Sequence, residues 1–159
     1  MSVSETPALK LQINDSDAIH RSDLTERLSA CGYAVVEASD GEEGFNVLVR
    51  DQPDAVVTEL CMSPVDGWDF MRRARTVRPL MPTIILTEDT SEDTLLKALR
   101  MGVCDFLRKG TAVRAIDRAV RAAVEGVPTA RRFREETRDI IGTSDSIEGL
   151  RLKIDKIGT

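Results

Sequence analysis

Several apolar runs in this sequence end on polar residues whose side chains carry charge or a reactive hydroxyl. The run AVVTEL at 55–60 contains an acid, Glu59, and the chain then breaks through Ser63 and Pro64 into Asp66-Gly67. An acid at the end of a buried strand is costly to hold there, which suggests a functional role. The residues that follow the other runs are Asp15, Ser16, Asp17, Thr87 and Lys109. Three acids, two hydroxyls and a lysine would form a charged binding or reaction site if the fold brought them together.

Other kinds of site find little support in the sequence. Cys31, Cys61 and Cys104 are scattered without a CxxC pair, and His20 is the single histidine, so a zinc site is not expected. The cysteines are predicted to be reduced thiols, and His20 a half-buried, hydrogen-bonded residue on a helix face that it shares with Leu24. The sequence contains no GxxxxGK[ST] phosphate loop and no nucleophile elbow, so we do not expect an enzyme.

The elements that must position these residues alternate regularly along the chain. Apolar strand patterns occupy 9–14, 34–38, 55–60, 83–88 and 104–110, and helical patterns occupy 18–31, 42–50, 66–76, 91–101 and 112–125. Five strand–helix repeats predict an α/β fold, a doubly wound five-stranded parallel sheet with right-handed crossovers. Sites in such sheets lie at the carboxyl ends of the strands, so we expect the polar residues to converge there.

Length and composition set the class of protein and its expected divisions. The 159 residues are 42% hydrophobic and 31% charged with a net charge of −5, which is typical of a soluble globular domain and argues against nucleic-acid binding. No apolar run is long enough to cross a membrane and no secretory signal opens the chain, so a cytoplasmic location is expected. The predicted divisions are a disordered start at 1–8, one domain at 9–126, a linker helix at 127–139 and a separate segment at 140–159.

Three longer stretches resemble the receiver domain of two-component response regulators over about residues 8–126. They are DSDAIHRSDLTERLSACGYAVVEASDGEEGF, PDAVVTELCMSPVDGWDFMRRAR and PTIILTEDTSEDTLLKALRMGVCDFLRKG. The resemblance implies the flavodoxin-like, CheY-like form of the predicted fold. The later stretch IIGTSDSIEGLRLKID resembles the opening of the AAA+ ATPase domain of NtrC-type activators, which work with sigma-54 polymerase.

The resemblance also assigns expected roles to the polar residues. It places Asp15 and Ser16 on the family's acidic magnesium-binding pair, Glu59 on the phosphoacceptor aspartate, Thr87 on the hydroxyl, Phe106 on the switch aromatic and Lys109 on the lysine. This chain departs from the pattern because the acceptor is a glutamate and the second acid of the pair is a serine. The prolines expected beside Met62 and Lys109 are also missing from those places.

These departures predict an atypical receiver. The longer Glu59 side chain moves the carboxylate by more than about an ångström, and Ser16 removes an anionic oxygen from a magnesium site. Asp17 is the remaining acid nearby, but it should begin the helix and point elsewhere. We therefore expect weak or absent magnesium at Asp15, Asp17 and Glu59, no other cofactor, and no phosphorylation of Glu59 by a histidine kinase.

Alternatives stay open at this point. Glu59 either mimics a phosphorylated aspartate by reaching toward Lys109 and Thr87, or merely pairs with Lys109 in a silent pocket. The competing function is a conventional magnesium-dependent phospho-switch that uses Asp17 or Glu59 and a histidine kinase.

The expected partners are proteins rather than nucleic acid or membrane. A homodimer is predicted through helix 91–101, strand 104–110, helix 112–125 and the linker, together with an attached or separate AAA+ ATPase domain. The charged residues expected on the dimer surface are Lys97, Arg100, Arg114, Asp117, Arg118 and Arg121.

Overall fold

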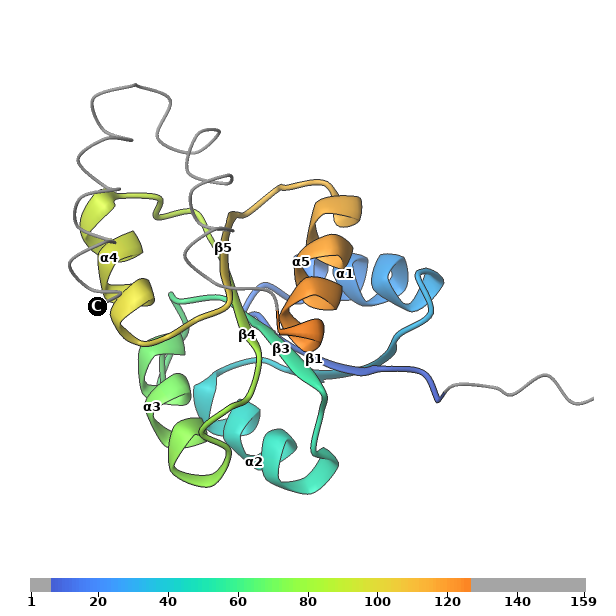
Figure 1. Cartoon of the computed structure of the whole chain (residues 1–159), viewed down its shortest axis with the longest axis horizontal. Helices are drawn as coiled ribbons and strands as arrows, with labels where there is room; N and C mark the ends of the chain where they lie inside the picture. Colours follow the sequence, from blue (N-terminus) through green and yellow to red (C-terminus); the bar gives the residue numbers. More distant parts are fainter. Residues whose placement is uncertain (1–6, 127–159) are drawn as a thin grey trace, which may run out of the picture.

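Residues 7–126 are described by the computed structural model, and they form a parallel sheet with helices on both faces (Figure 1). The strands are β1 (Lys10–Asn14), β2 (Ala34–Ala38), β3 (Ala55–Thr58), β4 (Thr83–Thr87) and β5 (Asp105–Arg108). The helices are α1 (Ala18–Ala30), α2 (Gly41–Asp51), α3 (Gly67–Val77), α4 (Glu92–Arg100) and α5 (Val113–Glu125). The strand order is β2-β1-β3-β4-β5 and every pairing is parallel, which confirms the predicted doubly wound fold.

The sheet is buried on both faces because its strands carry apolar side chains toward two separate cores. On one face α2, α3 and α4 cover a core that includes Leu48, Phe70, Leu95 and Phe106. On the other face α1 and α5 cover a core of Leu11, Leu24, Leu28, Leu107 and Ile116. Burial on both sides explains why β3 and β4 read as continuous apolar runs in the sequence.

The strand register decides which residues meet at the carboxyl edge of the sheet. Asn14 at the end of β1 lies opposite Thr58 at the end of β3, so Asp15 and Glu59 follow side by side. Thr87 at the end of β4 lies opposite Arg108 at the end of β5, and Lys109 follows. The strands β3 and β5 are shorter than predicted, so Glu59 and Lys109 are the first residues beyond the strands instead of lying within them.

The helix that follows β3 begins close to the backbone of Glu59. The Asp66 side chain accepts a hydrogen bond from the N–H of Asp69 and caps α3 at its first turn. A Cβ atom placed on Gly67 would lie 2.2 Å from the carbonyl oxygen of Glu59, so only glycine allows this approach. Gly67 therefore fixes how closely α3 packs against the segment that carries Glu59.

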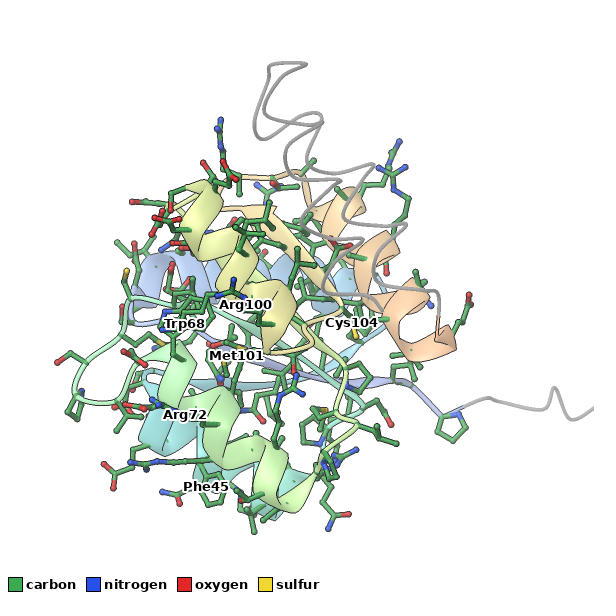
Figure 2. The ribbon with its side chains drawn as sticks, turned by 60° about the vertical axis from the view of Figure 1, so that its left-hand side comes forward. Phe45, Trp68, Arg72, Arg100, Met101 and Cys104 are labelled. Carbon is green, nitrogen blue, oxygen red and sulfur yellow. The ribbon has the colours of Figure 1, made fainter. Side chains whose placement is uncertain are left out.

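The same side of the sheet carries a contact between α3 and α4. The Lys97 ammonium lies 4.4 Å from the centre of the Trp68 ring, a cation–π arrangement that joins the two helices. Figure 2 shows Trp68 on α3 beside Arg100 at the end of α4 and Met101, the residue that follows it. Met101 and Trp68 also pack against the core below.

Several predictions concern parts of the chain beyond this domain. The linker helix at 127–139 and the ATPase-like segment at 140–159 lie outside the described residues, as does most of the predicted disordered start at 1–8. Within residues 7–126, no helix has the length and apolar character needed to span a bilayer. The three cysteines are free thiols, as predicted, with Cys61 exposed.

Candidate functional site

Two carboxylates meet at the carboxyl ends of β1 and β3. The backbone N–H of Asp15 donates to Ala38 O at 3.0 Å, and that of Glu59 donates to Asn14 O at 2.9 Å, so both residues are anchored by the sheet. Asp15 is 2% exposed and Glu59 6%, which is unusual burial for acids. Buried acids of this kind require compensating partners.

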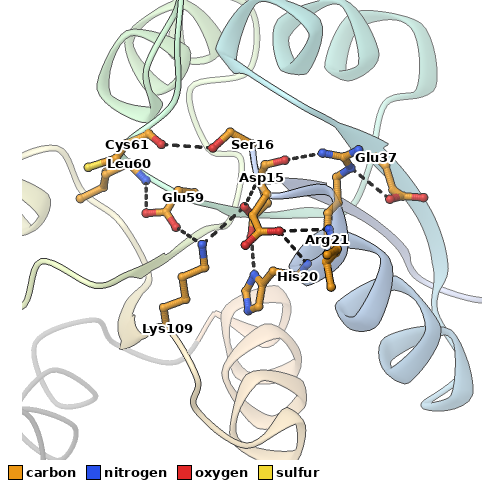
Figure 3. A network of polar contacts seen from close by, with 11 residues as sticks. Asp15, Ser16, His20, Arg21, Glu37, Glu59, Leu60, Cys61 and Lys109 are labelled. Carbon is orange, nitrogen blue, oxygen red and sulfur yellow. Dashed lines mark hydrogen bonds and ion pairs between the residues drawn. The ribbon is translucent and has the colours of Figure 1, made fainter.

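Lys109 supplies a positive charge to both carboxylates (Figure 3). Its Nζ lies 3.0 Å from Glu59 Oε2 and 3.6 Å from Asp15 Oδ1. Its backbone N–H donates to Thr87 O at 2.7 Å, which holds the residue at the edge between β4 and β5. Partial burial lowers the pKa of Lys109, but the hydrogen bond and charge of Glu59, with the charges of Asp15 and Asp17, outweigh burial and keep that pKa above its ordinary value.

His20 contacts the other oxygen of Asp15. Its ring Nδ1 donates a hydrogen bond to Asp15 Oδ2, and the side chains of the pair are 21% and 3% exposed respectively. We predicted a half-buried, hydrogen-bonded histidine but did not count it among the site residues. Its spacing five residues after Asp15, across the first turn of α1, is the sequence signal for this contact.

Arg21 fixes the backbone at the same place. Its Nη1 donates to the carbonyl oxygen of Asp15 at 2.6 Å and its Nε donates to Glu37 on β2 at 3.2 Å. The guanidinium thereby joins the end of β1 to the edge strand and limits movement of Asp15. Figure 3 shows Arg21 between Asp15 and Glu37.

The remaining carboxylate oxygens bind backbone donors. Asp15 Oδ1 accepts from the N–H of Asp17 at 2.9 Å, and Glu59 Oε1 accepts from the N–H of Leu60 at 3.1 Å. All four carboxylate oxygens of Asp15 and Glu59 therefore have partners within the chain. The negative charges of this site at the strand ends, called the crevice below, are therefore compensated by residues of the chain itself.

Asp17 and Ser16 lie beside this network and use their side chains elsewhere. Asp17 caps α1, as its position predicted, and its carboxylate accepts from the N–H groups of Ile19 and His20 at 3.0 and 3.1 Å. Hydrogen bonds from the backbone N–H groups of His20 and Ile19 hold the pKa of Asp17 below its usual value. Burial alone would raise this pKa, but its effect is smaller than that of the His20 hydrogen bond. Ser16 is exposed and donates to Cys61 O at 3.5 Å.

Thr87 and Phe106 also stand apart from the ion pairs. The Thr87 hydroxyl accepts from the N–H of Asp89 at 3.2 Å, and Phe106 is 0% exposed within the core beneath α4. Of the predicted site residues, the structure thus brings Asp15, Glu59 and Lys109 into contact. The signalling roles that the resemblance assigns to Thr87 and Phe106 remain predictions.

A series of buried hydrogen bonds within the sheet leads to the backbone of Glu59. Gln12 donates to Asn14 Oδ1 and to Gly44 O, each at 2.8 Å, and Asn14 donates to Thr58 Oγ1 at 3.4 Å. Thr58 in turn donates to the carbonyl oxygen of Glu59 at 2.9 Å. These contacts supply partners for the Gln12 Nε2 group and for the Asn14 amide, whereas Gln12 Oε1 is buried without a partner. They also couple the backbone of α2 to the Glu59 backbone.

The donor set does not fit the magnesium ion that the family resemblance implies. Asp15 is already engaged by Lys109, His20 and a backbone N–H, Ser16 offers no carboxylate, and Asp17 serves as a helix cap. Within residues 7–126, no group of three or more His, Cys, Asp and Glu side chains is arranged to hold a metal ion. A magnesium ion prefers several anionic and neutral oxygens in near-octahedral order, which this arrangement does not offer.

Comparisons with known proteins agree on one family. The model of the response regulator receiver domain matches residues 11–121. The transcriptional regulatory protein GlrR of Escherichia coli is 36% identical over 135 residues, which cover 84% of this chain and 30% of GlrR. The response regulator MprA of Mycolicibacterium vanbaalenii is 32% identical over 114 residues, which cover 72% of this chain and 49% of MprA.

Solved structures show the same fold. A response regulator receiver domain protein from Clostridium thermocellum superimposes with a TM-score of 0.70 at 25% identity, covering 74% of this chain and 94% of its own. The FixJ-N structure gives 22% identity, with 77% and 98% coverage. The chain spans between about a third and a half of the length of the curated relatives named above.

Proposed function

This chain belongs to the family of response regulator receiver domains, and from that premise we propose that it is a phosphorylation-independent regulatory module of a transcriptional regulator. In this role it is a non-enzymatic, cytoplasmic domain that acts through protein contacts. The likeness to GlrR and MprA, both named as regulators, supports a place in transcriptional control.

The observation that carries this proposal is the ion pair between Glu59 and Lys109. The residue at the acceptor position is buried, its Oε2 lies 3.0 Å from Lys109 Nζ, and its Oε1 binds a backbone N–H. A carboxylate held in this way has no free oxygen directed at a phosphodonor. Phosphoryl transfer also requires neutralisation of the phosphoryl oxygens by a metal, which the donor set does not favour.

The contacts support a fixed ion pair more than a mimic of phosphorylation. A phosphoryl group has three acceptor oxygens and close to two negative charges at neutral pH, whereas Glu59 contributes one charge. Lys109 meets Glu59, but the polar contact of Thr87 goes to Asp89. We therefore propose that the pair holds the crevice in one state, and that regulation arises from what the domain binds.

A homodimer remains the proposed assembly, but three of the charged residues predicted for it have partners within the chain. Lys97 lies over Trp68, and Asp117 binds Arg121 at 2.8 Å and the Tyr33 hydroxyl at 2.6 Å. Arg100, Arg114 and Arg118 are exposed on α4 and α5 and are the better candidates for contacts with a second copy or an ATPase domain.

Direct phosphorylation tests the proposal. The protein is incubated with acetyl phosphate at millimolar magnesium and its intact mass is measured, with a conventional receiver treated in parallel as the positive control. We expect no added phosphoryl mass on this chain and no binding of beryllofluoride. Phosphate found on Glu59 or Asp17 would instead establish the conventional phospho-switch.

A further inference from the structure

The hydrogen bond between His20 and Asp15 gives this crevice a feature beyond the replaced acceptor. We propose that His20 competes with divalent cations for Asp15 and so acts as the positioning residue that keeps the crevice closed to metal. The inference deepens the proposed function and rests on it, because it assigns the contact of Asp15 Oδ2 to His20.

The fold fixes both partners of this contact by their backbones. The N–H of Asp15 is bonded to Ala38 O, and Arg21 binds its carbonyl oxygen. The N–H of His20 is bonded to the Asp17 cap at 3.1 Å, which sets the first turn of α1 against the end of β1. The backbones that carry both side chains are therefore held in place, which preorganises the contact.

The distribution of partners around Asp15 makes the competition specific to His20. Oδ1 already has a backbone N–H at 2.9 Å and Lys109 Nζ at 3.6 Å, whereas Oδ2 is held by the imidazole. The backbone donor cannot move away without breaking the cap of α1. A cation approaching Asp15 from the exposed Ser16 side must therefore displace the His20 ring from Oδ2.

The contacts of Asp15 also predict that an acid restored at Ser16 would not by itself give tight metal binding. Restoring an acid at Ser16 adds one anionic oxygen at an exposed position, but Asp15 stays buried and fully bonded. Tight binding therefore requires two changes together: an acid at position 16 and removal of the imidazole donor, whereas an acid alone gives weak binding in competition with His20.

Metal binding by variants of the whole chain tests this inference. The probe is Mn²⁺, an oxygen-seeking stand-in for magnesium, and free Mn²⁺ is counted by electron paramagnetic resonance. We compare Ser16→Asp, Ser16→Asp with His20→Leu, and Ser16→Asp with Ile19→Ala. Ile19 is the matched control because it lies on the same turn with its side chain 85% exposed.

We expect the variant with Ser16→Asp and His20→Leu to bind Mn²⁺ about ten- to hundredfold more tightly than Ser16→Asp alone. This factor corresponds to the free energy of one hydrogen bond to a charged group. Ile19→Ala is expected to leave the affinity of Ser16→Asp unchanged. Equal affinities for the Ser16→Asp protein with and without the histidine would overturn the inference.

A second measurement works without replacing the histidine. Because the chain has a single histidine, the ring nitrogen resonances of a ¹⁵N-labelled Ser16→Asp protein belong to His20 without ambiguity. Titration with Mg²⁺ is expected to shift the Nδ1 resonance as the cation displaces the ring. Saturation with Mg²⁺ that leaves this resonance in place refutes competition.

The two proposals fail in different ways. Phosphate on Glu59 of the natural chain would overturn the proposed function. A histidine without influence on Mn²⁺ affinity, in a chain that still takes up no phosphate, would overturn only the inference about His20.

Discussion

Replacing Lys109 with methionine removes the one lysine that serves both buried carboxylates. The Lys109 side chain is 16% exposed and its Nζ contacts Glu59 at 3.0 Å and Asp15 at 3.6 Å. Methionine keeps most of the apolar stem and deletes only the charge. Glu59 then remains buried with a single backbone donor, and Asp15 keeps His20 and the N–H of Asp17.

Loss of one member of a buried ion pair costs about 3–5 kcal/mol of unfolding free energy, because the other charge is left without compensation. Lys109 is partly exposed, and water reaching the crevice will offset some of this loss. We therefore expect Lys109→Met to destabilise the domain by about 3 kcal/mol. That is a large part of the about 5–15 kcal/mol that stabilises a typical domain.

Glu59→Gln should cost less, about 1 kcal/mol, because Lys109 can still interact with Asp15 and with water. The double variant removes both charges of the pair and should be about 2 kcal/mol less destabilised than the sum of the two single variants. Arg108→Met is the matched control, since Arg108 is the exposed neighbour of Lys109, and it should change stability by less than about 0.5 kcal/mol.

Urea denaturation followed by far-ultraviolet circular dichroism measures the stability of the natural chain and of these four variants. Unfolding of Lys109→Met at the same urea concentration as the natural chain would show that these ion pairs do not stabilise the domain. Additive effects of the Glu59 and Lys109 substitutions would likewise contradict the prediction, because additivity would mean that the two side chains do not interact in solution.

Further measurements test two other contacts of the domain and the titration of Lys109. Gly67→Ala places a Cβ 2.2 Å from Glu59 O and should lower stability by about 1–3 kcal/mol in thermal melts, whereas an unchanged melting temperature would contradict the close approach. Tyr33→Phe removes the 2.6 Å hydrogen bond to Asp117 and should cost about 1 kcal/mol in urea denaturation, and no loss would mean that water replaces it. The raised pKa of Lys109 predicts that the stability difference between the natural chain and Lys109→Met is constant from neutral pH up to the ordinary lysine pKa of 10.5 and falls as the pH rises through the higher folded pKa; a difference that already falls between about pH 7 and 9 would refute it.

The sequence was sufficient to predict the fold because the apolar runs and helical repeats alternate without interruption. Parallel strands buried on both faces require this pattern, and their carboxyl ends are then fixed at one edge. The convergence of Glu59 and Lys109 at one edge of the sheet was predicted from topology alone, although these residues are separated by two further strands in the chain.

The part that could not be predicted depends on local side-chain geometry. His20 shares a helical face with Leu24 and Leu28, and periodicity indicates the face but not the depth along the helix axis. At the first turn of α1 that face lies over the strand end instead of the core, so the imidazole meets Asp15. Thr87 similarly lies at the end of a strand, as predicted, but its hydroxyl accepts a hydrogen bond from the N–H of Asp89 in the turn that follows.

The contact between Trp68 and Lys97 has a practical consequence for work on this protein. Trp68 is the sole tryptophan of the chain, and its ring lies between α3 and the ammonium group carried by α4. Its ultraviolet emission is consequently an intrinsic optical probe of how these two helices sit against each other. Partner binding that shifts α4 can thus be followed on the unlabelled protein, with Lys97→Met as the reference spectrum for loss of the cation–π contact.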